Sequence, residues 1–174
     1  YVGHNTDFAG FLYMVRKYKV EVCGKKVLVL GKGGASKAII AVLRSLNAAS
    51  ILTVYYKESE DSITYEECIA KHSDADVIVN TTPVGMYPDS DVSPLDLTPF
   101  TNCKAVLDII YNPIETALVR QARKLGMTGA TGLEMLTAQA VYASEFFQNK
   151  KMCVSDDEYT QLIDRITETV AASL

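Results

Sequence analysis

The chain has 174 residues, of which 48% are hydrophobic and 22% charged, and its formal net charge is −4. This composition is typical of a globular protein with a hydrophobic core. The acidic balance argues against nucleic acid as a partner, because domains that bind its phosphates usually carry a basic excess. The longest purely apolar run, 38–43, is far too short to span a membrane, so we expect no membrane partner.

The four cysteines lie far apart, at Cys23, Cys68, Cys103 and Cys153. Because they form no CxxC pair, they predict neither a metal site nor a redox centre. Each is best interpreted as a small, partly buried hydrophobic residue. A reducing cytoplasm is the simplest setting for such a chain.

Short apolar runs alternate with segments of helical periodicity. The runs predict strands over 26–31, 51–56, 76–80, 105–110 and, more briefly, 127–131. Helices are predicted over 35–46, 65–72, 113–124, 133–148 and 156–172. Strands that alternate with helices predict a Rossmann-like, doubly wound α/β fold, with a mainly parallel sheet flanked by helices.

A glycine-rich loop, GKGGAS, joins the first predicted strand to a helix. Gly31 would allow a tight turn, Gly33 would let the backbone approach a pyrophosphate, and Ser36 is small enough for close packing of helix on strand. The start of the helix would offer free N–H groups to the phosphates. We predict that the loop, with Gly34 and Ala35, binds a dinucleotide; the alternative is a glycine-rich turn without a ligand.

The end of the second predicted strand bears on the identity of the cofactor. An acidic residue that binds the ribose is expected about 20 residues after the glycine loop. The sequence there is Tyr56-Lys57-Glu58. Lys57 could pair with a 2′-phosphate and select NADP, whereas Glu58 could bind ribose hydroxyls and select NAD. Either side chain could instead be merely solvated. We favour NADP.

Polar residues follow the third predicted strand. Asn80, Thr81 and Thr82 come directly after the apolar run, with Gly85 close behind. Ligands on parallel sheets bind beyond the carboxyl ends of the strands. We therefore expect this segment to lie where the ribose and nicotinamide of the cofactor pass.

Candidate residues also follow the fourth and fifth predicted strands. Tyr111 stands at the exit of one, and Gly132 precedes a helix that carries Met135 and Gln139. These last two are four residues apart and share a helix face. Each residue has a simple structural explanation, as an aromatic plug, core filler or solvent-exposed amide, but their common place at one sheet edge favours a ligand site.

These motifs, taken in order, resemble those of the shikimate dehydrogenases. The start of the chain matches GxNTDxxG, the glycine loop is similar to GAGGAxRA, and 80–86 is similar to N-A-T-x-x-G-M. The segment 108–116 resembles D-x-x-Y-x-P-x-x-T, and 132–139 resembles G-x-x-M-L-x-x-Q. The resemblance covers nearly the whole chain.

The resemblance implies the reversible, NADPH-dependent reduction of 3-dehydroshikimate to shikimate, a step in aromatic amino acid biosynthesis. Asp7 would be the aspartate of a Lys–Asp pair, orienting the lysine proton donor and binding a substrate hydroxyl. Gln139 would hydrogen-bond the substrate, and Tyr111 would lie near substrate and nicotinamide. The cofactor-binding residues would include Met86, Gly132 and Met135.

The resemblance also implies a domain organisation. Residues 1–20 would form an interdomain linker helix with the NTD motif, residues 21–150 the NAD(P)-binding domain, and residues 151–174 a helix packing back toward an N-terminal substrate domain. We expect the chain to be a fragment without that domain and its lysine, and so inactive alone. A homo-oligomer is compatible with the sequence. The alternatives are an NAD-preferring quinate/shikimate dehydrogenase and a non-catalytic dinucleotide-binding domain.

Two departures from the family pattern concern the cofactor. Lys32 stands where the family usually has alanine, and its longer side chain is expected to point away from the dinucleotide. The family's Asn-Arg-Thr is replaced by 56–58, and the following helix, with a second basic residue, is largely deleted between Ser59 and Tyr65. A lone lysine is a point charge without the planar fork that arginine offers a phosphate.

Overall fold

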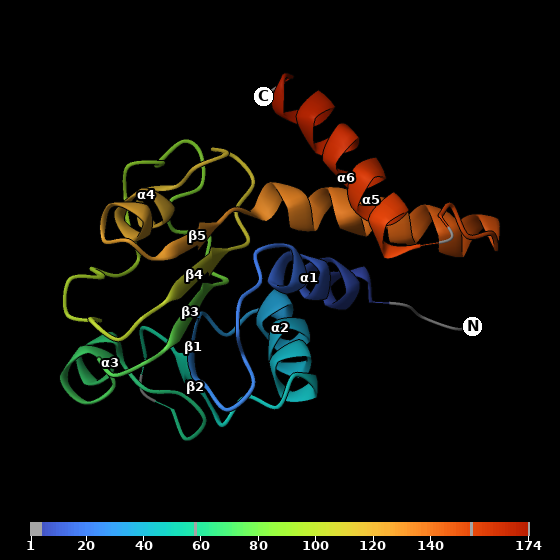
Figure 1. Ribbon diagram of the computed structural model, residues 1–174. Coiled ribbons are helices and arrows are strands. Elements are labelled where there is room, and N and C mark those ends of the chain that lie inside the picture. The colour runs from blue at the N-terminus through green and yellow to red at the C-terminus, as the bar shows by residue number, and fades with distance from the viewer. Residues whose placement is uncertain (1–4, 58, 154, 174) are drawn as a thin grey trace.

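A five-stranded sheet organises the chain in the computed structural model, which describes residues 5–57, 59–153 and 155–173 (Figure 1). The strand order is β2-β1-β3-β4-β5, and all four pairings are parallel. This confirms the predicted Rossmann-like, doubly wound fold. The strands are β1 (Lys26–Leu30), β2 (Ser50–Val54), β3 (Val77–Asn80), β4 (Ala105–Asp108) and β5 (Thr128–Ala130).

Helices cover both faces of the sheet (Figure 1). They are α1 (Thr6–Lys17), α2 (Gly34–Ser45), α3 (Tyr65–Lys71), α4 (Ala117–Lys124), α5 (Gly132–Gln148) and α6 (Asp156–Ala171). Alternate side chains of β1 point to opposite faces of the sheet. Val27 and Val29 pack with α1 and α2 on one face, while Leu28 packs with α3 and α4 on the other. Within the described residues, no helix combines the length and apolar character that crossing a bilayer requires.

Several element boundaries differ from the sequence prediction, and at two of them, the start of α4 and the end of β2, hydrogen bonds override the pattern. Helix α4 was expected from Pro113, but Thr116 is its N-cap, accepting a hydrogen bond from the Val119 N–H at 3.3 Å. Strand β2 stops at Val54, because the next N–H, that of Tyr55, donates to the Ile63 carbonyl. The chain beyond β2 therefore folds back as a turn.

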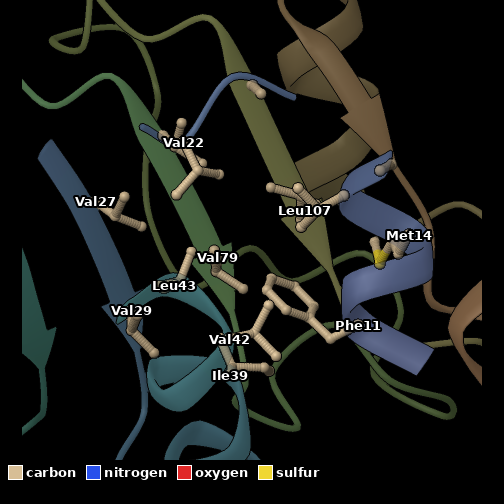
Figure 2. Packing of buried hydrophobic residues seen from close by; sticks show 14 of the residues in the cluster. Phe11, Met14, Val22, Val27, Val29, Ile39, Val42, Leu43, Val79 and Leu107 are labelled. Atoms are coloured by element: carbon tan, nitrogen blue, oxygen red, sulfur yellow. The ribbon is translucent and has the colours of Figure 1, made fainter. Parts of the chain in front are cut away.

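Helix α1 packs into the main core. Phe11 and Met14 are fully buried in a cluster that includes Val42 of α2 and Leu107 of β4. Figure 2 shows the Phe11 ring pointing toward Val42. Asn5 caps the helix by accepting the Asp7 N–H at 2.9 Å. The start of α1 is thereby held at a defined position beside the sheet.

Helix α6 packs on α5 and α1 through a smaller apolar cluster. Its buried members are Tyr13, Ala138, Val141 and Ile163. Burial, together with the nearby negative charge of Asp164, raises the pKa of Tyr13 to about 12. The three helices α1, α5 and α6 thus share apolar contacts beside the sheet.

We expect Phe11→Ala to lower the free energy of unfolding by about 3–5 kcal/mol, because it removes a fully buried aromatic ring and leaves a cavity. Urea denaturation followed by circular dichroism measures the change. Phe147→Ala is the matched control, since that ring is 86% exposed and its loss should stay within about 0.5 kcal/mol. Equal effects of the two substitutions would show that α1 contributes little to the core.

Candidate dinucleotide site

A cavity of about 630 Å³ opens beyond the carboxyl ends of three neighbouring strands. From β1 the chain adds β2 on one side of the sheet and β3, β4 and β5 on the other, so the strand order switches between β1 and β3. Ligands of open α/β sheets bind at such a switch point. The cavity lies at this switch point, because the loops that follow β1, β2 and β3 supply most of its walls. Its lining residues are Gly31, Lys32, Gly33, Tyr55, Tyr56, Tyr65, Thr81, Thr82, Pro83, Val84, Ser93 and Pro94.

Gly31 makes the sharp turn at the end of β1. Its φ of +103° lies in a region that residues with a side chain rarely adopt, and a Cβ there would be 2.8 Å from the Thr81 Oγ1. Its N–H donates to the Val54 carbonyl at 2.8 Å. Position 31 therefore requires glycine, because of its backbone conformation and because Thr81 lies so close.

The next glycines leave the loop open. A Cβ added at Gly33 or Gly34 would have no described atom within 4 Å. Gly33 is the N-cap of α2, and among the described residues no side chain caps this end of the helix. The Ser36 hydroxyl is buried and donates to the Gly33 carbonyl at 2.7 Å, and Ala35 is half-buried. The first-turn N–H groups of α2 therefore remain available to an anion.

A buried carboxylate organises the loops beyond β3 and β4. Asp108 accepts hydrogen bonds from the Asn80 amide at 3.1 Å, the Ile110 N–H at 3.1 Å and the Thr116 hydroxyl at 2.7 Å. Burial raises the pKa of this carboxyl above its ordinary value, although the three donors oppose the shift. The side chain of Asp108 thus joins the ends of two strands to the start of α4.

Asn80, expected from its sequence position to meet the cofactor, is fully buried in this network. Its amide oxygen accepts from the Thr82 N–H at 3.0 Å and the Thr82 hydroxyl at 2.7 Å. The neighbouring Thr81 hydroxyl donates to the Leu30 carbonyl at 2.6 Å. The two threonines line the cavity, whereas the buried Asn80 side chain holds the loop in place through its hydrogen bonds to Thr82.

The first and last motifs of the sequence meet at a hydrogen bond. The Gln139 amide of α5 donates to the Asp7 Oδ1 of α1 at 2.8 Å, across 132 positions in the chain. The helices approach closely at Gly10, where a Cβ would lie 2.6 Å from the Gln139 Cγ and 2.7 Å from the Met135 carbonyl. Met135 itself is buried in the main core cluster.

Gly132 brings the end of β5 against the chain beyond β4. Its N–H donates to the Ile110 carbonyl at 3.0 Å, and a Cβ would lie 2.1 Å from the Ile109 carbonyl oxygen. Because these neighbours are backbone atoms, they cannot move aside as a side chain would. Glycine at this position permits the contact between the two loops.

Tyr111 and Met86, both exposed, lie in two loops that a backbone hydrogen bond connects. The N–H of Tyr87, which follows Met86, donates to the carbonyl of Asn112, which follows Tyr111, at 3.1 Å. The exposed fractions of Tyr111 and Met86 are 44% and 45%. Both side chains are therefore accessible at the ligand edge of the sheet.

Of the two lysines discussed from the sequence, only Lys32 lines the cavity. Lys57 is exposed, with its Nζ 5.2 Å from the centroid of the Tyr56 ring, and is not among the described residues that line the cavity. Lys32 does line it, and its Nζ donates to the Ser59 Oγ at 3.1 Å and pairs with Asp61. Glu58, like the first motif residue Gly3, lies outside the described residues.

The sheet order and the glycine turn beside the cavity define a Rossmann-like α/β protein, a class whose members bind nucleotides at this edge. No family model matches the sequence. The sequence is 40% identical to the shikimate dehydrogenase (NADP(+)) of Caldanaerobacter subterraneus subsp. tengcongensis, in an alignment that covers 83% of this chain and 59% of that protein.

Solved structures agree with this relationship. The chorismate mutase/shikimate 5-dehydrogenase fusion protein of Clostridium acetobutylicum is 33% identical, with a TM-score of 0.87 over 97% of this chain and 61% of that one. The shikimate 5-dehydrogenase of Thermus thermophilus, in complex with NADP(H) and shikimate, is 26% identical, with a TM-score of 0.76 over 95% and 63%. Over most of its length the chain is thus similar to proteins named shikimate dehydrogenase, and it spans about three fifths of the length of these proteins.

The contrast between Gly31 and Gly33 predicts opposite results for the same substitution. Gly31→Ala should lower the free energy of unfolding by about 1–3 kcal/mol, because alanine is strained at a φ of +103°. Gly33→Ala should change it by less than about 0.5 kcal/mol, since its φ is −86° and the added methyl group meets open space. Urea titrations of the ligand-free protein measure both, and equal losses would contradict the assignment.

Proposed function

We propose that this chain is the dinucleotide-binding part of a shikimate dehydrogenase, which reversibly reduces 3-dehydroshikimate to shikimate with NADPH. The observation that carries the proposal is the open start of α2 at Gly33 and Gly34, beside a cavity of about 630 Å³ at the sheet's switch point. The name of the curated relative and the ligands of the Thermus protein support NADP and shikimate as the cofactor and product.

The residues present fit a dinucleotide. Gly33 and Gly34 leave room for a pyrophosphate to approach the backbone, and the start of α2 presents N–H groups and a positive dipole end. The cavity volume lies within the range of about 300–1,000 Å³ usual for small-molecule sites. Thr81 and Thr82 would contact the cofactor along the floor of the cavity. When bound, the nicotinamide ring supplies the hydride chemistry.

Asp7 and Gln139 would serve the substrate. Reduction of a ketone builds negative charge on its oxygen, so a positioned proton donor is needed, which contributes about 10²- to 10⁴-fold. The Gln139 amide engages Oδ1 of Asp7, and this orients the carboxylate so that Oδ2 can accept from a lysine ammonium or a substrate hydroxyl. Gln139 would also hydrogen-bond the substrate. The lysine is proposed to come from the substrate domain of the whole protein.

The remaining candidates have smaller proposed roles. Tyr111 would lie near the substrate and nicotinamide, and Met86 and Gly132 would contact the nicotinamide through packing and backbone. A reducing cytoplasm remains the setting we propose, because all four cysteines are free thiols.

We expect Gly33→Ala to weaken NADP⁺ binding by about tenfold or more, because its methyl group would occupy the space of the pyrophosphate, while the ligand-free fold is unchanged. Isothermal titration calorimetry with NADP⁺ and with NAD⁺ measures the affinities. Ser45→Ala, at the far end of α2, is the control. The proposal fails if the well-folded protein takes up neither nucleotide.

Asp7→Asn in the gene product that contains this chain should lower kcat for shikimate oxidation by about 10²-fold or more, since a neutral amide cannot orient an ammonium donor. The Kd for NADP⁺ should stay within about twofold, because Asp7 does not line the cavity. Asp157→Asn, at an exposed position of α6, is the control. Parallel losses of turnover and cofactor affinity would mean that Asp7 is structural.

The same gene product distinguishes the alternatives. Comparison of kcat/KM for NADP⁺ and NAD⁺, with shikimate and with quinate, separates the proposed enzyme from an NAD-preferring quinate/shikimate dehydrogenase. A product that binds a dinucleotide but oxidises neither acid would favour the non-catalytic binding domain.

A further inference from the structure

The turn beyond β2 is compact, and its first residues, Tyr55 and Tyr56, line the cavity. The Tyr55 N–H donates to the Ile63 carbonyl at 2.9 Å, and the Ile63 N–H donates to the Thr53 carbonyl at 2.9 Å. Between them the Ser62 N–H donates to the Ser59 carbonyl at 3.2 Å. In this fold the end of the second strand is where the adenine-bearing ribose is recognised. The turn therefore brings polar side chains to the place where NADP and NAD differ.

Lys32 reaches this turn from the glycine loop. Its backbone stands between Gly31 and Gly33, and its Nζ donates to the Ser59 Oγ at 3.1 Å and pairs with Asp61. The side chain lines the cavity and is 35% exposed. A cation is thus held between the pyrophosphate position at the start of α2 and the ribose position at the end of β2.

Lys57 occupies the family's sequence position for the phosphate-binding side chain but is directed elsewhere. Its Nζ lies 5.2 Å from the centroid of the Tyr56 ring, a cation–π distance, and the residue is exposed. The lysine expected to bind the phosphate and the lysine at the cavity are therefore different residues.

We propose that Lys32, rather than Lys57, recognises the 2′-phosphate of the cofactor, and that Asp61 limits its preference for NADP. The proposal rests on the proposed function, because it needs a dinucleotide on the glycine loop. The Lys32 ammonium has three donors, of which Ser59 and Asp61 take two, so that one remains for the phosphate. Lys32 thus replaces the basic residues that the shortened segment beyond β2 lacks.

The negative charge of Asp61 would weaken binding of the 2′-phosphate. Its hydrogen bonds from Lys32 and Ser59 hold the pKa of this carboxyl below its ordinary value, so it is ionised at neutral pH. A carboxylate beside the ammonium repels a phosphate, yet it can accept hydrogen bonds from the ribose hydroxyls of NAD. Lys32 and Asp61 therefore act in opposite directions on the choice of cofactor.

The test uses two fragments of the cofactors that differ only in the phosphate, 2′,5′-ADP and 5′-AMP. Calorimetry on the purified protein should show that Lys32→Ala weakens 2′,5′-ADP binding by about tenfold and leaves 5′-AMP within about twofold. Asp61→Asn should tighten 2′,5′-ADP by about threefold or more, because it removes the opposing charge. The matched control, Lys57→Ala, should change either affinity by less than about twofold.

Salt provides a second readout. Raising the ionic strength should reduce the preference for 2′,5′-ADP in the unchanged protein and have little effect on it in Lys32→Ala, because exposed charges are screened. Circular dichroism confirms that each variant is folded.

The outcomes separate the two proposals. If the unchanged protein binds neither fragment and neither dinucleotide, the proposed function fails. If both fragments bind and Lys32→Ala leaves their ratio unchanged, the dinucleotide site stands and the role of Lys32 is wrong. If Lys57→Ala causes the loss instead, the phosphate is recognised as the sequence first suggested, and the role of Lys32 is again overturned.

Discussion

The buried carboxylate of Asp108 is the interaction on which the ligand edge depends. It accepts from three donors that belong to the end of β3, the loop beyond β4 and the cap of α4. Burial of an ionisable group without partners is costly, so the donors and the carboxylate stabilise one another. Through Asn80 the same network sets the position of Thr82, which lines the cavity. An acidic side chain outside the proposed ligand contacts thereby determines the shape of the site.

Much of the fold could be predicted from sequence because its signals are local. Apolar runs marked the five strands, and the glycine spacing marked the turn after β1. The start of α4 could not be located from Pro113, because a cap at Thr116 decides it through a hydrogen bond of its own side chain. The end of β2 was also misplaced, since its limit is set by a contact with Ile63 eight residues beyond Tyr55.

The candidate site was predictable as a set of loops but not as a set of contacts. Sheet topology brings the segments at Gly31 and Thr81 together, and their places in the sequence were sufficient to find them. The direction of a long side chain is decided by partners distant in sequence. The contacts of Lys32 with Ser59 and Asp61 in the turn beyond β2 could therefore not be predicted from the sequence. The sequence pattern that pointed to Asp108 was a polar residue at the end of an apolar strand.

Gly10 shows that a residue without a side chain can control the position of Asp7 and Gln139, the proposed substrate-binding pair. At this position α1 and α5 touch backbone to backbone, and even a methyl group would wedge them apart against the Met135 carbonyl. Such a wedge would pull the Asp7 carboxylate from the amide that orients it. Glycine at position 10 is thus needed both for the close packing of α1 on α5 and for the hydrogen bond between Gln139 and Asp7.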